Sequence, residues 1–140
     1  MMTSIQPILL VTEDAACRES FTRALRAEGW QVLHSKPGRP AVQALQANNL
    51  GLIVLHFGVS NTAGEPVATL EALTDFDPLL PVLLVCDRRD VINYRTALMA
   101  DMVMRTPVRG EELAEAAYTL LSETLRERMH RKSADLAALA

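Results

Sequence analysis

The stretch GLIVLHFGVSNTAG, Gly51–Gly64, contains the run that decides the fold. Leu52–Leu55 is an unbroken series of large aliphatic residues, a pattern typical of parallel strands covered by helices on both faces. A histidine, His56, follows it directly. The other predicted strands are Pro7–Val11, Trp30–His34, Pro81–Cys86 and Asp101–Arg105.

Helical patterns separate these strands. Asp14 is expected to cap the first helix and Gly29 to end it, and Pro40 suits the first turn of the second helix. The last helical pattern is long and is predicted to run as one helix over residues 110–132. Strand and helix alternate five times, which predicts an α/β fold with a doubly wound, five-stranded parallel sheet.

Composition excludes several classes of protein. The chain has 140 residues, 49% of them hydrophobic, and a formal net charge of -3, which suits one domain without a nucleic-acid-binding surface. Its apolar runs fall short of the about 20 residues of a membrane helix, and no signal peptide is evident. Cys17 and Cys86 lack metal-site spacing, which indicates reduced thiols. We therefore expect a soluble, cytoplasmic protein that binds neither membranes nor nucleic acid directly.

Ligands of doubly wound sheets bind at the carboxyl ends of the strands. The segments at these ends are expected to lie together at one edge. They are Thr12–Asp14, His56–Gly58, Cys86–Asp87 and Arg105–Pro107.

The same segments resemble bacterial response-regulator receiver domains. ILLVTEDAACRESFTRALRAEGWQVLHS resembles their opening strand and helix, and GLIVLHFGVSNTAGEP resembles their third strand and the loop after it. LPVLLVCD and ALMADMVMRTPV resemble the fourth strand and the turn that ends at Pro107. The resemblance implies a CheY-like, flavodoxin-like sheet in strand order 2-1-3-4-5. It also implies a receiver domain at residues 1–122 and an extended C-terminal helix, or a linker to an output domain, at 123–140.

In that family a histidine kinase phosphorylates an aspartate at the end of the third strand, beside a magnesium ion. An acidic pair, a hydroxyl residue, a lysine and an aromatic switch residue complete the site. Here the corresponding residues are His56 (acceptor), Thr12 and Glu13 (acidic pair), Cys86 (hydroxyl), Thr106 (lysine) and Val103 (switch). Magnesium requires oxygen ligands. The resemblance therefore implies a degenerate pseudo-receiver without cofactor, metal or catalytic residues.

Four interpretations of His56 follow. A neutral imidazole fills the vacated site and bonds Glu13 or a backbone group. Alternatively, His56, Glu13 and Cys86 form a transition-metal site, or Cys86 and His56 form a nucleophile and base. His56 could also be phosphorylated itself. A vacated pocket could instead serve as a small-molecule or metal sensor.

We expect a phosphorylation-independent module for protein–protein interaction or dimerisation in two-component-type signalling or transcription regulation, and not an enzyme. The resemblance implies a binding face on the fourth helix, fifth strand and fifth helix, for a protein partner or a second copy. Its candidate residues are Tyr94, Met99, Met104, Val108, Leu113 and Tyr118.

Overall fold

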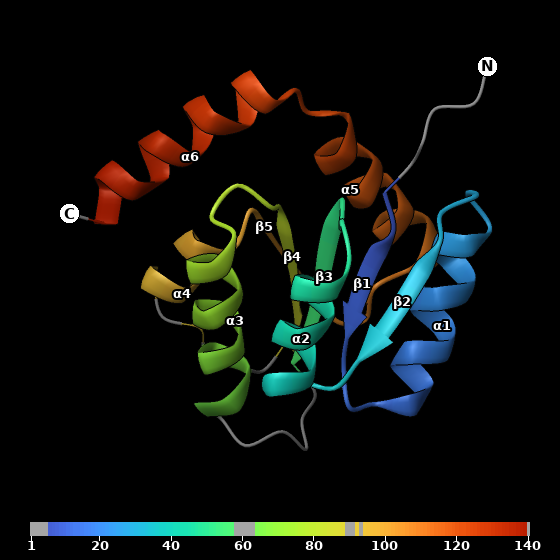
Figure 1. Ribbon diagram of the computed structural model, residues 1–140. Helices are drawn as coiled ribbons and strands as arrows, with labels where there is room; N and C mark the ends of the chain where they lie inside the picture. The colour runs from blue at the N-terminus through green and yellow to red at the C-terminus, as the bar shows by residue number, and fades with distance from the viewer. Residues whose placement is uncertain (1–5, 58–63, 89–91, 93, 140) are drawn as a thin grey trace.

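The computed structural model describes residues 6–57, 64–88, 92 and 94–139 of the chain. Its five strands form one parallel sheet in the order β2-β1-β3-β4-β5, as predicted. Figure 1 shows the strands side by side with β2 at one edge. The strands are β1 (Ile8–Val11), β2 (Val32–Ser35), β3 (Leu52–Phe57), β4 (Val82–Cys86) and β5 (Met102–Arg105).

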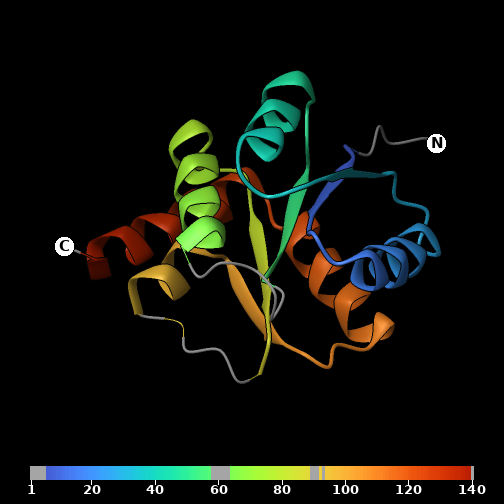
Figure 2. The ribbon, with the colours of Figure 1, turned by 90° about the horizontal axis from the view of Figure 1, so that it is seen from below.

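Helices cover both faces of this sheet. Figure 2 shows α2 and α3 on one side of the strands and α1 and α5 on the other. The helices are α1 (Ala15–Arg26), α2 (Arg39–Ala47), α3 (Gly64–Phe76), α4 (Tyr94–Met99), α5 (Gly110–Ser122) and α6 (Leu125–Leu139). The sequence pattern predicts the fourth helix over Asp90–Ala100, and part of that segment lies outside the described residues.

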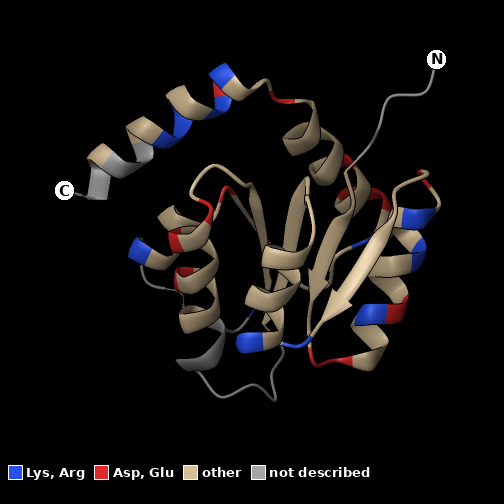
Figure 3. Ribbon diagram, viewed as in Figure 1, with Lys and Arg blue, Asp and Glu red and all other residues tan. Residues whose placement is uncertain are grey.

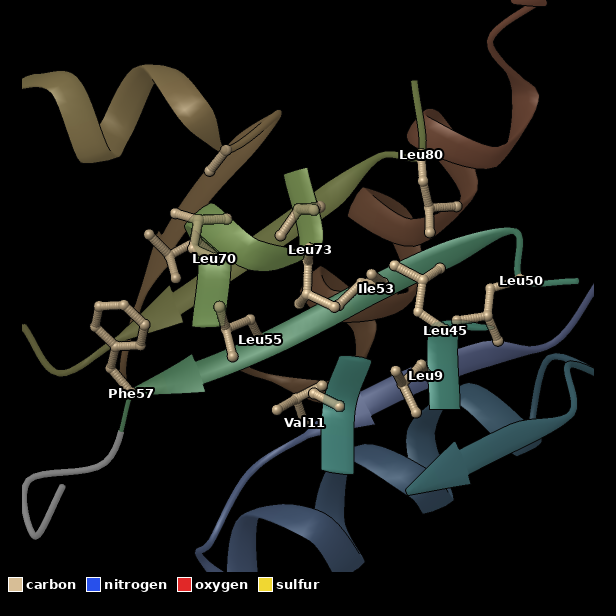
Figure 4. Packing of buried hydrophobic residues seen from close by; sticks show 14 of the residues in the cluster. Leu9, Val11, Leu45, Leu50, Ile53, Leu55, Phe57, Leu70, Leu73 and Leu80 are labelled. Carbon is tan, nitrogen blue, oxygen red and sulfur yellow. The ribbon is translucent and has the colours of Figure 1, made fainter. Parts of the chain in front are cut away.

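Alternation along the strands divides the core into two apolar layers. Leu9, Ile53 and Leu84 belong to the layer beneath α2 and α3, which Figure 4 shows. Leu10 and Val54 belong to the layer beneath α1 and α5. Consecutive strand residues thus enter different layers. Side chains at the ends of two strands can meet only when they lie on the same face of the sheet.

The first helix begins where the sequence predicts. The Cys17 N–H donates to Asp14 Oδ1 at 2.9 Å, so Asp14 is the N-cap of α1. Regular helix ends at Arg26, and Gly29 follows with a φ of 95°, a left-handed conformation that glycine adopts without strain. The expected glycine turn is therefore present, slightly beyond the end of the helix.

The single long helix predicted at residues 110–132 is wrong. Helix α5 ends at Ser122, and α6 begins at Leu125 and lies across the end of the sheet where β4 and β5 begin (Figure 1). The Glu127 N–H donates to Thr124 Oγ1, and the Thr124 N–H donates to Glu127 Oε1. This reciprocal capping box starts a new helix at Thr124, and the chain changes direction there.

Charged groups hold α6 against the rest of the fold. Arg131 donates to Asp101 Oδ1 at 2.6 Å and to both carboxylate oxygens of Glu123 at 2.8 Å. Lys132 lies 3.2 Å from the same Asp101 oxygen, and the Val82 N–H donates to Asp101 Oδ2. Hydrogen bonds from Arg131 hold the pKa of Glu123 below its usual value. One carboxylate, Asp101, thus links α6 to the start of β4.

Candidate functional site

The strand ends bring Thr12 and His56 together. Thr12 follows β1, His56 is the penultimate residue of β3, and Thr12 Oγ1 lies 2.8 Å from His56 Nδ1. Both side chains are buried, with 4% and 6% exposure. Thr12 Oγ1 also accepts the Asp14 N–H at 3.0 Å. The hydroxyl and the ring nitrogen share one hydrogen bond, and the tautomer of the imidazole decides which of the two donates.

An aromatic ring from α1 packs against the His56 side chain. The Phe21 ring meets the His56 ring edge to face, with centroids 6.1 Å apart and an angle of 69° between the ring planes. The sequence pattern places Phe21 on the inner face of the first helix but does not indicate that it meets His56. Glu13 or a backbone group is the partner that the sequence suggests for the imidazole, and the structure shows a contact of His56 with Thr12.

Cys86 belongs to the opposite face of the sheet. In the β3–β4 register, His56 pairs with Val85, and Phe57 pairs with Cys86. Paired residues of neighbouring strands share a face, and Cys86 packs in the layer beneath α2 and α3, whereas His56 contacts Phe21 of α1. The register therefore does not bring Cys86 and His56 together, as a nucleophile–base pair or a shared metal site requires. Among the described residues, no group of three His, Cys, Asp or Glu side chains could hold a metal ion.

A second thiol lies nearer to Thr12. Burial raises the pKa of Cys17 to about 12, while a hydrogen bond with Thr12 acts in the opposite direction and the Asp14 charge adds to the rise. At neutral pH this cysteine is a thiol and a poor nucleophile. The only sequence signal for Cys17 beside the strand ends is its place in the first turn of the helix that Asp14 caps.

Known proteins share this sequence pattern. No protein-family model matches the chain. The response regulator MprA of Mycolicibacterium vanbaalenii is 32% identical over 120 residues, which cover 84% of this chain and 51% of that protein. The probable transcriptional regulatory protein TcrX of Mycobacterium tuberculosis is 29% identical over 119 residues, 84% of this chain and 50% of that protein. The chain thus spans about half the length of these relatives.

Solved structures share the fold. A CheY-like response regulator receiver domain protein from Methanospirillum hungatei JF-1 superposes with a TM-score of 0.75 at 20% identity, covering 89% of this chain and 99% of that chain. TrrA from Thermotoga maritima, in complex with Mg(2+)-BeF, gives 0.73 at 17% identity over 83% of this chain and 99% of that chain. Sequence and fold together support a response-regulator receiver domain.

Three other positions compared with the receiver family lie just after β1, within β5 and directly after β5. Thr106 directly follows β5, and its N–H donates to the Cys86 carbonyl at 2.9 Å. Glu13 is exposed next to Thr12, and Val103 is partly exposed on β5. The lysine position thus carries a half-buried hydroxyl residue whose backbone is engaged with β4.

One of the six residues predicted for an interaction face does not lie at the surface. Leu113 is completely buried in the layer beneath α1 and α5, so its assignment to an exposed face is wrong. Leu113 lies on the side of α5 that faces the sheet, and burial of its apolar side chain there stabilises the fold. Tyr94 and Tyr118 are exposed, whereas three of the predicted residues are partly buried against the core, namely Met99, Met104 and Val108.

Tyr118 borders a shallow hollow on the side of α5 that faces α1. The hollow is also lined by Glu28, Glu111 and Glu115, so the exposed tyrosine has acidic neighbours. None of the helices in the described part of the chain has the length and apolar character that crossing a membrane requires.

Proposed function

We propose that this receiver domain works without phosphorylation, as a cytoplasmic module for protein–protein interaction or dimerisation in two-component-type signalling or transcription regulation. The observation that carries the proposal is the buried hydrogen bond between Thr12 and His56 at the place where the family's aspartate is phosphorylated. We propose no enzymatic activity for it.

The chemistry of the strand ends supports this proposal. Aspartyl phosphorylation needs a carboxylate, and residue 56 is an imidazole whose Nδ1 is already hydrogen-bonded. Magnesium prefers several oxygen ligands in octahedral geometry, but position 12 offers only a hydroxyl that is already engaged twice. Position 106 offers no ammonium group to pair with a phosphoryl oxygen.

A sensor that uses a vacated pocket receives less support. Thr12 and Phe21 each contact the His56 side chain, and all three residues are buried, which does not favour a ligand at this place. The loop after β3, residues 58–63, lies outside the described residues. We therefore prefer the interaction function.

Beryllofluoride and acetyl phosphate with magnesium test the loss of phosphorylation. We expect no magnesium-dependent change in the NMR spectrum of the wild-type domain and no phosphorylated species in its mass spectrum. The T12D/H56D/T106K variant, which restores the family's residues, is the control and should respond. An adduct on wild-type residue 56 would contradict the proposal. Stability of that adduct in alkali would identify phosphohistidine.

The partner is proposed to be another protein or a second copy of this chain. The name of the relative TcrX, a probable transcriptional regulatory protein, motivates the link to transcription. Light scattering after size-exclusion chromatography distinguishes the two partners, when the full chain is compared with a chain ending at Ser122. A concentration-dependent dimer would support self-association, and a monomer at all concentrations would favour a different protein.

A further inference from the structure

A groove of about 780 Å³ lies between α1 and the edge strand β2, away from the Thr12–His56 pair. We call it the α1–β2 groove. Its polar lining consists of Arg18, Glu19, Thr22, Arg23, Arg26 and His34. Figure 3 shows basic residues recurring along α1 beside β2. The function proposed above does not use this groove.

The α1–β2 groove carries excess positive charge in an acidic chain. Three arginines line it against a single carboxylate, although the whole chain has a net charge of -3. That carboxylate, Glu19, already pairs with Arg23 at 3.0 Å. Burial and then the positive charges of Arg18 and Arg26 hold the pKa of His34 below its usual value. The groove is therefore suited to a ligand that brings carboxylates.

Backbone groups of β2 point to the outer edge of the sheet, next to the α1–β2 groove. The Ile8 amide donates to the Gln31 carbonyl at 2.9 Å, and the Thr12 amide, directly after β1, donates to the Ser35 carbonyl at 3.1 Å. Gln31 and Ser35 therefore turn their backbone groups toward β1. Because backbone direction alternates along a strand, Val32 and His34 turn theirs to the outer edge. Arg26 Nη2 lies 3.5 Å from the Val32 carbonyl, in agreement with this direction. An edge of this kind can pair with a further strand.

The floor of the groove is held in place. Thr22 Oγ1 lies 2.7 Å from His34 Nε2, and Thr22 is buried in α1. This contact joins the helix to the edge strand and fixes the imidazole orientation. A ligand would meet a surface whose shape is already set, which reduces the entropy lost on binding.

We propose that the α1–β2 groove binds an extended acidic segment of a partner protein. The segment adds to the sheet beside β2 and pairs with the outward backbone groups of Val32 and His34. The Arg26 guanidinium leaves the Val32 carbonyl and, together with Arg18, binds the carboxylates of the segment. Strand addition supplies affinity through the backbone, and the arginines select acidic side chains. This inference rests on the proposed function as a protein-binding module and names the surface and the chemistry of its partner.

An NMR titration tests the inference on the full chain. The probe is an eight-residue peptide in which glutamate alternates with valine. We expect amide shifts at Val32 and His34 and a higher His34 pKa in the complex. The R18E/R26E variant should raise Kd at least tenfold. R95E/R126E is the matched control, because it changes the net charge equally at exposed positions on α4 and α6, and its Kd should not change.

A second peptide separates strand pairing from simple charge attraction. It has the same side chains, but alternate backbone nitrogens are methylated, and it should lose the binding. Equal binding of both peptides, or equal weakening by both double variants, would overturn the inference. If R18E/R26E does not fold by circular dichroism, R18Q/R26Q and R95Q/R126Q replace the pair.

Two further outcomes can be distinguished from those of the peptide titration. Peptide-free shifts at β2 that grow with protein concentration and vanish in R18E/R26E would show that a second copy occupies the groove, which would overturn the acidic-partner assignment. A wild-type adduct with beryllofluoride at residue 56 would overturn the proposed phosphorylation independence without changing the peptide result. The two proposals therefore fail separately.

Discussion

Replacing Asp101 with asparagine should destabilise the protein by releasing α6. The Asp101 side chain is only 2% exposed and accepts hydrogen bonds from Arg131 and Lys132 of α6 and from the Val82 N–H. Asparagine keeps the size and one carbonyl acceptor but removes the negative charge. The substitution therefore tests the ionic attachment with little change in packing.

The magnitude follows from these contacts. Breaking a buried ion pair costs about 3–5 kcal/mol when the remaining charge is trapped. Arg131 is 29% exposed and keeps Glu123, so water and that carboxylate recover part of the loss. We expect D101N to lower the free energy of unfolding by about 2 kcal/mol. D101A also leaves the Val82 N–H without its acceptor and should cost about 4 kcal/mol.

Urea unfolding followed by circular dichroism measures both values. The control is E111Q, which removes an ion pair of 3.8 Å with Arg109 between side chains that are 87% and 73% exposed. It should change stability by no more than about 0.5 kcal/mol. If D101N loses no more stability than E111Q, the attachment of α6 does not depend on the buried charge, and the reasoning is wrong.

Three other predictions concern single residues. L113A should cost about 2–5 kcal/mol of unfolding free energy because Leu113 is fully buried, whereas Y118A should change it by less than about 0.5 kcal/mol; urea unfolding of both would refute the burial argument if the order were reversed. Cys17 should react with iodoacetamide much more slowly than an exposed thiol, and mass-spectrometric labelling rates near that of a free thiol would contradict its raised pKa. Glu123 has a lowered folded pKa, so its contribution is fully present above its ordinary value of 4.5 and is lost as pH falls through the folded value. Thermal unfolding between about pH 3 and pH 6 should show a shallower acid loss for E123Q than for wild type, and identical pH profiles would count against the pairing with Arg131.

Local patterns in the sequence determine most of the sheet. The aliphatic runs around Leu9, Ile53 and Leu84 mark the central strands because only strands buried on both faces lack polar alternation. Asp14 was predictable as a cap because its short side chain can accept a nearby helix amide. These features depend only on residues close together in the sequence, so they can be predicted without knowledge of the tertiary contacts.

The remaining differences have one local cause and two tertiary causes. The apolar spacing from Leu113 to Met129 is compatible with one helix, but the short Thr124–Glu127 capping box interrupts it. The same spacing did not distinguish the buried Leu113 from surface residues of the same helix. The pairing of His56 with Thr12 depends on the register between β1 and β3, which a single-sequence pattern does not specify.

Asp101 contacts both α6 and the start of β4, so it couples the two segments. Its Oδ2 accepts the first amide of β4, while its carboxylate also receives the cations of α6. Detachment of α6 therefore removes the cations that balance the charge of Asp101, and Asp101 is the acceptor of the Val82 amide. Opening of α6 and loosening of the first β4 residue should behave as one cooperative unit, and the Val82 amide should exchange its hydrogen at the rate at which α6 detaches. A motion outside the sheet would thus become measurable within it.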